Sequence, residues 1–511
     1  MRCFFLFAPV FIEWPFAIAQ EIRKTNPDAS FAGLHRGGKD VIRQISLHKE
    51  NCFDPLYAMA ELEQQWIEAE VDQEALAEFE ARFEPGFMKR IIVADRKMGY
   101  GYVTGGVVPP CALSRMSNDH DMVIRYFYGM ASFIDRMLVE QKITHVFCYA
   151  VAGGFALALR ELCRHHKIIF RQLEHTRIET LNILDDESPT ILAPIARLYQ
   201  EALKNPDLVS STIPQAELYI KKFREHPVQP GYMEHNKNEL KRQSSWRGIV
   251  KQLYRDLYGL ASDIVKRPER ELEKTSEWDL LVHNLQRAFR MKKLAKQNPF
   301  RTVEQVPKRP YAYFPLHVDP EASTMILSPM HVNQIHIIES ISKSLPLSWN
   351  LLVKEHFPMI GLRPNGFYEQ IRRMPGVYLI HPFENNFNLI KNAHITCTIT
   401  GTAGWESLLL KRPAIVFGNT PYLALEQGMI HTPDLSNLPE KIQEALSIPP
   451  IDDRRLILYL AAVYKLSFEF PSHLLWGSAS REAVEANWSI VEHISRQITE
   501  ENPEVLTTAQ A

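Results

Sequence analysis

The sequence predicts an α/β protein with two Rossmann-like, doubly wound domains and a helical insertion between them. Two observations support this. Short, nearly continuous apolar runs alternate with helix-length segments in the first part of the chain, and the same alternation restarts near Pro310. Strands that are apolar on both faces are typical of parallel sheets covered by helices. We expect an N-terminal Rossmann-like domain over residues 1–215, a basic helical insertion over 216–309, a C-terminal Rossmann-like domain over 310–450, and C-terminal helices over 451–511.

Length and composition exclude several classes of protein. The chain has 511 residues, 45% hydrophobic and 23% charged, which is ordinary for a globular protein and excludes a mainly disordered or fibrous one. The net charge of -2 gives no indication of a nucleic-acid partner. Six scattered cysteines without a C-x-x-C pair exclude a zinc or disulfide framework and fit a reducing compartment. We expect neither a metal nor a cofactor.

The N-terminal apolar run has two interpretations. Residues 3–8 have the pattern of a buried strand, followed by a helix over about 15–25 and a second strand over 30–34. The alternative is a secretory signal, because residues 17–19 (AIA) resemble a signal-peptidase site. Glu13 interrupts the run, so the strand is favoured.

The remaining elements continue the alternation. In the N-terminal domain, strands are expected at 90–94, 144–150 and 168–173, and helices at 122–140 and 155–166. Residues 54–81 are Glu-rich and helical in period, which predicts an insertion on the outside. In the C-terminal domain, strands are expected at 311–316, 351–354, 377–380, 395–400 and 414–417, and helices at 332–344, 366–373, 386–392 and 405–411. The tail from Arg454 to about Ile498 is helical. Facing strand ends predict an interdomain cleft that holds a ligand.

Residues 221–309 differ from the rest in charge. They hold 21 Lys and Arg against 11 Asp and Glu, a local net charge of +10. Trp246, Leu253, Leu257 and Leu260 form one apolar helical stripe. The segment is either a linker with a solvated basic face or a surface that attracts anionic lipid headgroups or an acidic polymer. No run reaches the roughly 18 apolar residues of a membrane span. We therefore expect a cytoplasmic protein, with peripheral contact to the inner face of the membrane through this segment as the second option.

The most informative motif follows the strand at 395–400. Thr400, Gly401 and Thr402 form a loop of small residues that opens a helix. Free backbone N–H groups at a helix start favour an anion such as phosphate. Glu406, in the first turn, can accept hydrogen bonds from the hydroxyls of a ribose or sugar. The alternative is a plain helix start in which Glu406 is a capping partner of Thr402.

A second motif follows the strand at 351–354. The strand delivers Lys354, Glu355 and His356 to its carboxyl end. Lys354 can neutralise phosphate charge, and His356 can donate to a phosphate oxygen or transfer a proton. Arg363, in the same loop, is a further candidate for phosphate binding. The alternative is a charge cluster in water at the edge of the sheet.

Further candidate groups lie in other strand-end loops. Glu321, near His317 and Asp319, can act as an acid or base, and the alternative is a turn around Asp319-Pro320. Glu13, in the first strand–helix loop, is a second candidate, unless it is only a carboxylate that stabilises the helix start. The charged loop after the strand at 168–173 should face the cleft, and its candidates for binding an acceptor are His175 and Arg177. The chain has no G-x-G-x-x-G, Walker A, H-E-x-x-H or G-x-S-x-G motif, which argues against the corresponding enzyme classes.

Four segments together resemble the capsular polysaccharide biosynthesis family, which includes the capsule enzymes that transfer Kdo from its CMP-linked donor. They are 314–323 (FPLHVDPEAS), 353–356 (VKEH), 400–406 (TGTAGWE) and 412–418 (RPAIVFG). The match is clearest over residues 311–425. In the family, Pro directly follows the histidine, whereas here Phe357 stands between His356 and Pro358. Met359 and Gly361 keep their usual offsets, so this is a substitution and not an insertion.

The resemblance implies a GT-B-like glycosyltransferase with the nucleotide sugar on the C-terminal domain and the acceptor toward the N-terminal one. By the same resemblance, His356 corresponds to a histidine near the donor phosphate, and Thr400, Gly401, Thr402 and Glu406 correspond to the nucleotide-binding loop.

We therefore predict a glycosyltransferase of capsular or surface polysaccharide synthesis. It would transfer a sugar from a nucleotide-sugar donor, with CMP-Kdo as one candidate, to a glycan or lipid-linked acceptor. The predicted catalytic residues are His356, Glu321 and Glu13, and Lys354 joins the nucleotide-binding set. Two alternatives stay open, a nucleotide-sugar epimerase of the two-Rossmann type and a non-catalytic polysaccharide export or assembly factor.

Overall fold

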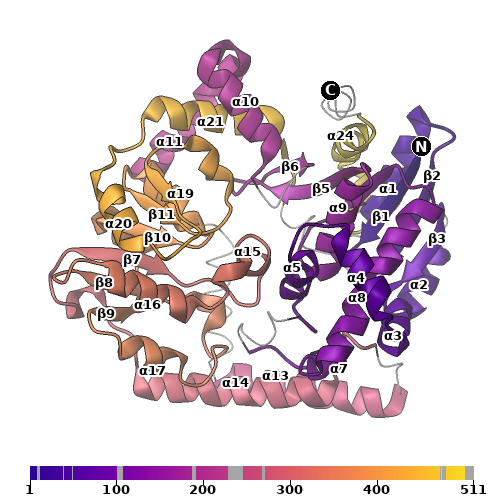
Figure 1. Ribbon diagram of the computed structural model, residues 1–511, viewed down its shortest axis with the longest axis horizontal. Coiled ribbons are helices and arrows are strands. Elements are labelled where there is room, and N and C mark those ends of the chain that lie inside the picture. The colour runs from indigo at the N-terminus through magenta and orange to yellow at the C-terminus, as the bar shows by residue number, and fades with distance from the viewer. Residues whose placement is uncertain are drawn as a thin grey trace.

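The protein folds into two α/β lobes, as a computed structural model shows (Figure 1). The structure describes residues 1–8, 12–37, 39–48, 50–99, 107–186, 191–227, 246–266, 271–471, 474 and 479–500. Each lobe has a mainly or wholly parallel sheet with helices packed on both faces. The predicted fold class is confirmed.

The sheet of the first lobe has the strand order β13-β6-β5-β4-β1-β2-β3 within the described residues. Its strands are β1 (Arg2–Phe7), β2 (Ser30–His35), β3 (Phe53–Ala58), β4 (His145–Cys148), β5 (Ile169–His175), β6 (Leu181–Asp185) and β13 (Phe468–Glu469). The strands from β3 to β5 are parallel, whereas β6 pairs antiparallel with β5 and β13 pairs antiparallel with β6. The N-terminal apolar run is therefore a strand in the middle of a sheet.

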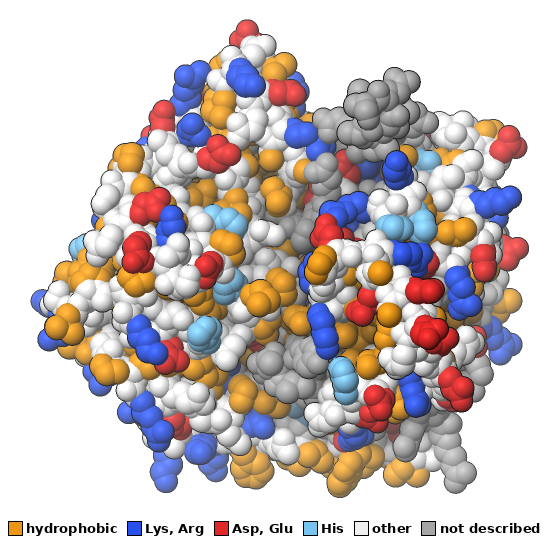
Figure 2. Space-filling model, viewed as in Figure 1, with side chains coloured by type: hydrophobic (Ala, Val, Ile, Leu, Met, Phe, Trp, Pro, Cys, Tyr) orange, Lys and Arg blue, Asp and Glu red, His pale blue; other side chains and the backbone are white. Residues whose placement is uncertain are grey.

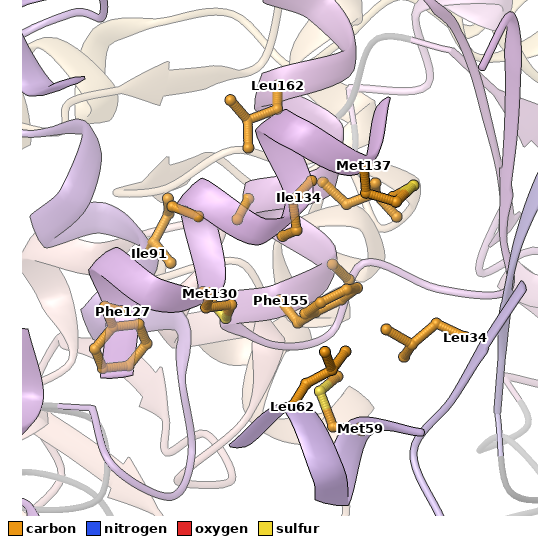
Figure 3. Close-up of a cluster of buried hydrophobic side chains, with 14 of the residues drawn as sticks. Leu34, Met59, Leu62, Ile91, Phe127, Met130, Ile134, Met137, Phe155 and Leu162 are labelled. Atoms are coloured by element: carbon orange, nitrogen blue, oxygen red, sulfur yellow. The ribbon is translucent and has the colours of Figure 1, made fainter. Parts of the chain in front are cut away.

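Both faces of β1 are buried, because its side chains alternate between two apolar clusters. Phe4 and Leu6 pack into the cluster of Figure 3, and Phe5 and Phe7 pack into the cluster on the opposite face. The first cluster includes side chains of α3 (Met59–Glu68), α5 (Phe87–Ala94), α8 (His120–Glu140) and α9 (Gly154–His165). The second includes side chains of α1 (Glu13–Thr25), α23 (Arg481–Glu485) and α24 (Trp488–Thr499). The lobe also contains α2 (Lys39–Ser46), α4 (Gln73–Ala81) and α7 (Ala112–Met116).

The sheet of the second lobe is parallel throughout, in the order β12-β11-β10-β7-β8-β9 as far as it is described. Its strands are β7 (Tyr311–Pro315), β8 (Asn350–Lys354), β9 (Val377–Ile380), β10 (Ile395–Thr398), β11 (Ala414–Val416) and β12 (Met429–His431). One face packs on α16 (Gln334–Ser344), α17 (Phe367–Arg372) and α20 (Leu438–Ser447). The other packs on α18 (Asn386–Asn392) and α19 (Thr402–Leu409). The short segments α15 (Ala322–Met325), η2 (Val303–Gln305), η3 (Pro329–His331), η4 (Phe357–Met359) and η5 (Pro421–Leu425) complete the lobe.

Helices from distant parts of the chain pack together over the second lobe. They are α10 (Ala193–Lys204), α11 (Ile213–Glu225) and α21 (Asp453–Leu466), with η1 (Pro206–Thr212) between the first two. They share one apolar cluster with α19 and β11, whereas α24 returns to the first lobe (Figure 1). The chain thus passes between the lobes more than once. The predicted domain limits at 215, 309 and 450 remain predictions.

Two long helices, α13 (Trp246–Lys266) and α14 (Glu277–Gln297), run along the lower edge of the molecule in Figure 1. Two contacts tie the start of α14 to the first lobe. The carbonyl of Leu272, just before the helix, accepts from the backbone N–H of Leu113, and Asp279 in the first turn pairs with Arg115. Near its end, Leu294 packs against the core of the second lobe. The predicted helical insertion thus bridges the two lobes.

Three sequence-based expectations were wrong in detail. Residues 90–94 are not a strand but the end of helix α5, because Phe87, Met88, Ile91 and Ile92 recur with a helical period and bury one face. Residues 53–58 form the edge strand β3 and not a helix. The short strands β6, β12 and β13 were missed. They have five, three and two residues, too few to show a clear period, and β13 forms only by pairing with β6 from a distant part of the chain.

The lobes contact each other at several points. Ala94 and Leu157 of the first lobe pack with Ile326 and Leu327 of the second. The backbone N–H of Val107 donates to the carbonyl of Leu362 at 2.7 Å.

All six cysteines are free thiols. None of the described helices is both long and apolar enough to cross a membrane.

Candidate functional site

Three of the predicted motifs meet at one edge of the second sheet. Strand β7 lies between β8 and β10, and the three are parallel, so the loops that follow them emerge side by side. The backbone N–H of Thr400, after β10, donates to Nε2 of His317, after β7, at 3.3 Å. Burial lowers the pKa of His317 to about 3, so its imidazole is neutral at physiological pH and can accept this bond.

The loop after β10 is held in place from several sides. The N–H of Gly401 donates to Oγ1 of Thr398 at 3.0 Å, and the hydroxyl of Tyr422 donates to the Gly401 carbonyl at 2.8 Å. A Cβ on Gly404 would lie only 2.3 Å from the Tyr422 hydroxyl, so a larger residue at 404 would disrupt this contact. The small residues therefore allow close packing of the loop itself, and helix α19 begins directly behind it at Thr402.

Glu406 is buried in the first turns of α19. Its carboxylate accepts from Oγ1 of Thr402 at 3.2 Å and from Nδ2 of Asn386 at 3.3 Å. The Thr402 bond agrees with the alternative given in the sequence analysis, in which Glu406 is a capping partner of Thr402. An ionised carboxylate offers about four acceptor positions, so two bonds leave capacity for a ligand hydroxyl. Burial raises the pKa of Glu406 to about 6, and the group is ionised above that pH.

Lys354 reaches the same asparagine from the end of β8. Its ammonium donates to Oδ1 of Asn386 at 3.2 Å, and the hydroxyl of Tyr313 donates to the same oxygen. Asn386 thus joins a lysine and a carboxylate that are 52 residues apart in the chain. Burial lowers the pKa of Lys354 to about 8, against the opposing attraction of Glu406. A buried cation near a helix start is suited to an anionic ligand.

This pKa predicts how phosphate binding depends on pH. The ammonium of Lys354 is fully charged below about pH 7 and is lost as the pH rises through 8. A bound anion would raise the pKa of Lys354 above its value in the free protein. Between these two pKa values, the affinity for a phosphate-containing ligand is expected to fall about tenfold per pH unit. Glu406 stays ionised throughout this range. Calorimetric titration from pH 7 to 10 measures this, and the Lys354→Met variant should bind weakly with no such dependence. A steep pH dependence in that variant would contradict the assignment.

His356 follows two residues after Lys354 and is half-buried. Burial lowers the pKa of its imidazole, although Glu355 and Glu321 act in the opposite direction. Its Nδ1 is buried and has no hydrogen-bond partner within the part of the chain that is described. A buried, unpaired imidazole nitrogen is costly unless a ligand or water meets it. The departure from the family pattern is also explained locally, since the Phe357 ring packs on Phe383 and under the Lys354 ammonium.

Arg363 has a different role from the predicted one. Its guanidinium donates to both carboxylate oxygens of Glu355, at 3.0 and 2.9 Å, and to Asp319 at 3.2 Å. Its side chain is only 2% exposed. The prediction that it binds phosphate was wrong, because its donors are already used by two buried carboxylates. The sequence alone does not show which carboxylates are buried and which are in water. Arg363 is instead an internal support for the loops after β7 and β8.

The two other predicted catalytic carboxylates lie in different lobes. Glu321 accepts from the hydroxyl of Ser323 at 2.7 Å and interacts electrostatically with His356 and with Arg96 of the first lobe. Glu13 begins α1 and pairs with His48 of its own lobe at 3.3 Å. Of the two, Glu321 interacts with the candidate site through His356, and the catalytic role of each remains a prediction.

Of the predicted acceptor-side residues, Arg177 contacts the loop after β10 from the first lobe, and His175 supports Arg177. Nη1 of Arg177 donates to the carbonyl of Thr400 at 2.7 Å. The backbone N–H of Arg177 donates to Nδ1 of His175 at 2.8 Å, which shapes a turn where Arg177 has a φ of 66°. Arg177 therefore links the first lobe to the candidate nucleotide loop, and acceptor binding by this pair remains a prediction.

Sequence reasoning missed Asn386, Tyr313 and Tyr422. Asn386 begins α18, and Tyr313 lies in the middle of β7, so neither belongs to a strand-end motif. An asparagine at the start of a helix gives no sign of a side chain that bridges two other loops. Among the described residues, no group of three or more His, Cys, Asp and Glu side chains is placed to hold a metal ion.

Comparison with known proteins gives likenesses in fold only. No protein-family model and no curated protein matches the sequence. The structure is similar to the β-Kdo 2,7 transferase KpsC of Thermosulfurimonas dismutans, with 12% identity over 65% of this chain and 79% of that one and a TM-score of 0.33. It is also similar to a UDP-GlcNAc 2-epimerase of Methanocaldococcus jannaschii, with 12% identity, a TM-score of 0.24 and coverage of 91% and 99%. A glycosyltransferase of Rickettsia africae matches with 10% identity, a TM-score of 0.26 and coverage of 96% and 98%. Identities this low assign none of these activities to the chain.

Proposed function

We propose that the protein is a glycosyltransferase of the GT-B type that binds a nucleotide sugar at the second lobe. The observation that carries the proposal is the Lys354–Asn386–Glu406 network, which sets a buried cation and a buried carboxylate beside the start of α19. The cation suits the phosphates of the donor, and the carboxylate suits hydroxyls of its ribose or sugar. The resemblance of these segments to the capsular polysaccharide family supports the same proposal, with CMP-linked Kdo as a donor candidate and a surface glycan or glycolipid as the acceptor.

The reaction would break the bond between the anomeric carbon of the sugar and the donor phosphate. The acceptor oxygen would form the new bond to that carbon and lose its proton to a carboxylate, with Glu321 and Glu13 as candidates. Negative charge would develop on the leaving phosphate. Lys354, the backbone at Gly401 and Thr402, and the imidazole of His356 would stabilise that charge. His175 and Arg177 would lie on the acceptor side, where Arg177 already contacts the Thr400 carbonyl.

A binding and product assay tests the proposal. Thermal shifts are measured with CMP-, UDP- and GDP-linked sugars, and a ligand at 100 times its dissociation constant should stabilise the protein by about 2.7 kcal/mol. The ligand that binds is then incubated with and without acceptor. Sugar transfer that requires an acceptor supports the proposal. Conversion of the nucleotide sugar to an epimer without acceptor would instead favour an epimerase, and the absence of any shift would favour a non-catalytic factor.

A variant of Glu406 tests the binding part separately. Glu406→Gln keeps the size of the side chain and removes its charge, so bonds from ligand hydroxyls would weaken by about 1.5–3 kcal/mol, or roughly 10- to 150-fold in affinity. The matched control is Glu369→Gln on the exposed surface of α17, which should bind as the wild type does. Equal affinity in the wild type and both variants would remove Glu406 from the nucleotide site.

A further inference from the structure

Helix α13 exposes an apolar stripe that no described part of the protein covers. Tyr254 is 70% exposed, Tyr258 70% and Val265 82%, and these side chains lie on one face of the helix. The full stripe, at steps of one, three or four residues, is Val250, Tyr254, Leu257, Tyr258, Ala261, Ile264 and Val265. A face this apolar is unusual for a helix in contact with water alone.

Helix α14 exposes a second stripe of the same kind. Trp278 is 59% exposed and Phe289 71%, and Leu285 lies between them at helical spacing. The opposite side of α14 faces the protein, where His283 is buried and Met291 approaches Gly361. Apolar side chains gather along the lower edge of the molecule in Figure 2, where the two helices run. The stripes therefore sit on a platform that is fixed to both lobes.

The charges around the stripes have one sign. The exposed charged side chains described on α13 and α14 are Arg247, Lys251, Arg255, Lys292, Lys293 and Lys296. The acidic residues of the two helices are buried or half-buried, and they are Asp256, Asp263, Glu277 and Asp279. Asp256 is buried and accepts from Gln252 and Asn284, and Asp279 pairs with Arg115. The surface thus combines apolar and aromatic side chains with positive charge and has no exposed carboxylate among the described residues.

We propose that α13 and α14 lie flat in the interface of an anionic lipid bilayer. Their apolar stripes would enter the acyl boundary, the tyrosines and Trp278 would sit at headgroup level, and the Arg and Lys side chains would meet the anionic headgroups. A second copy of the chain fits less well, because a symmetric contact would bring two sets of positive charges together. This inference concerns a surface apart from the nucleotide site and does not rest on the proposed reaction.

Vesicle flotation of the full-length chain tests the proposal. The protein should bind to phosphatidylcholine vesicles that contain about one third phosphatidylglycerol, and it should bind much more weakly to vesicles of phosphatidylcholine alone. Leu257→Glu/Tyr258→Glu should weaken binding about tenfold or more. The charge variant Arg247→Gln/Lys251→Gln/Arg255→Gln should weaken it roughly 100-fold. The control is Leu347→Glu, because Leu347 is even more exposed (101%) than Leu257 and Tyr258 but lies in the loop before β8. This variant should bind as the wild type does.

A spectroscopic measurement distinguishes insertion from adsorption. Lipids brominated near the headgroup should quench the fluorescence of the wild type more than that of Trp278→Phe, since Trp278 would lie in the bilayer. Loss of vesicle binding in the Leu347→Glu control, unchanged binding in both α13 variants, or equal quenching with and without Trp278 would overturn the proposal. So would a dimer in sedimentation analysis that dissociates with Leu257→Glu/Tyr258→Glu while wild-type vesicle binding is absent.

Discussion

Replacing Arg363 by methionine is expected to lower the free energy of local unfolding of the β7–β8 region by about 3–5 kcal/mol. The guanidinium is the positive partner of two buried carboxylates, Glu355 at 2.9 Å and Asp319 at 3.2 Å, and it also donates to the carbonyl of His317 at 2.7 Å. Methionine fills similar space but leaves both carboxylates buried without a cation. The remaining bonds, such as that from the Tyr368 hydroxyl to Glu355 at 2.8 Å, are too few to replace it.

Hydrogen exchange of the amides in β7 and β8 measures this opening directly, which suits a chain of two lobes in which global unfolding need not be a single step. The double variant Arg363→Met/Glu355→Leu is the control. It removes one of the stranded carboxylates and should recover part of the loss, because an apolar pair can replace a buried ion pair at little cost. A single variant within 1 kcal/mol of the wild type would mean that the ion pair is not needed to hold these loops.

The sign of the pH effect gives a second check on the same variant. Without the guanidinium, the pKa of the Asp319 carboxyl should rise further, because the attraction of Arg363 opposes the effect of burial on that group. Burial already raises the pKa of Asp319 to about 6 in the presence of Arg363. Groups with raised native pKa values destabilise the fold most above those values. The deficit of Arg363→Met should therefore shrink as the pH falls from 7 to 5.

The sheets could be predicted largely because their strands are apolar on both faces. Runs such as residues 3–8 and 414–417 have no polar residue on either face, and central parallel strands bury both sides. The same criterion failed at 90–94, where an apolar run of strand length is the last part of a helix that begins at Phe87. It also failed at β3, an edge strand that begins with Phe53-Asp54-Pro55 and is partly exposed. Short apolar runs do not by themselves distinguish the two periods.

The candidate site was predictable where a residue directly follows a strand. Lys354, His356 and Thr400 all come from strand ends that the parallel order of β8, β7 and β10 brings together. What the sequence could not show is which charges are used internally. Arg363 and Lys354 are both basic residues near β8, yet the first is held by two carboxylates and the second by a neutral amide. That difference arises from contacts between loops far apart in the chain.

Replacing His356 by alanine is expected to reduce the turnover of the proposed sugar transfer by about 10²–10³-fold, with less than a tenfold change in donor affinity. Its Nδ1 is buried and has no partner among the described residues, so the imidazole is free to meet a group that appears only with the ligand. Because burial lowers its pKa, the ring is neutral at pH 7 and would act as a hydrogen-bond donor to the leaving phosphate. An interaction that strengthens as charge develops there affects kcat more than binding.

Two comparisons separate this role from a structural one. His356→Gln keeps a side-chain N–H donor and should recover part of the turnover, whereas a residue that only fills space would not respond to the donor. Because the imidazole is already neutral above pH 7, removing it should leave the fall in donor affinity above pH 8 in place, since that fall belongs to Lys354. Turnover of His356→Ala within threefold of the wild type, with its melting temperature unchanged, would exclude the histidine from the reaction and leave Lys354 and the start of α19 as the groups that meet the phosphate.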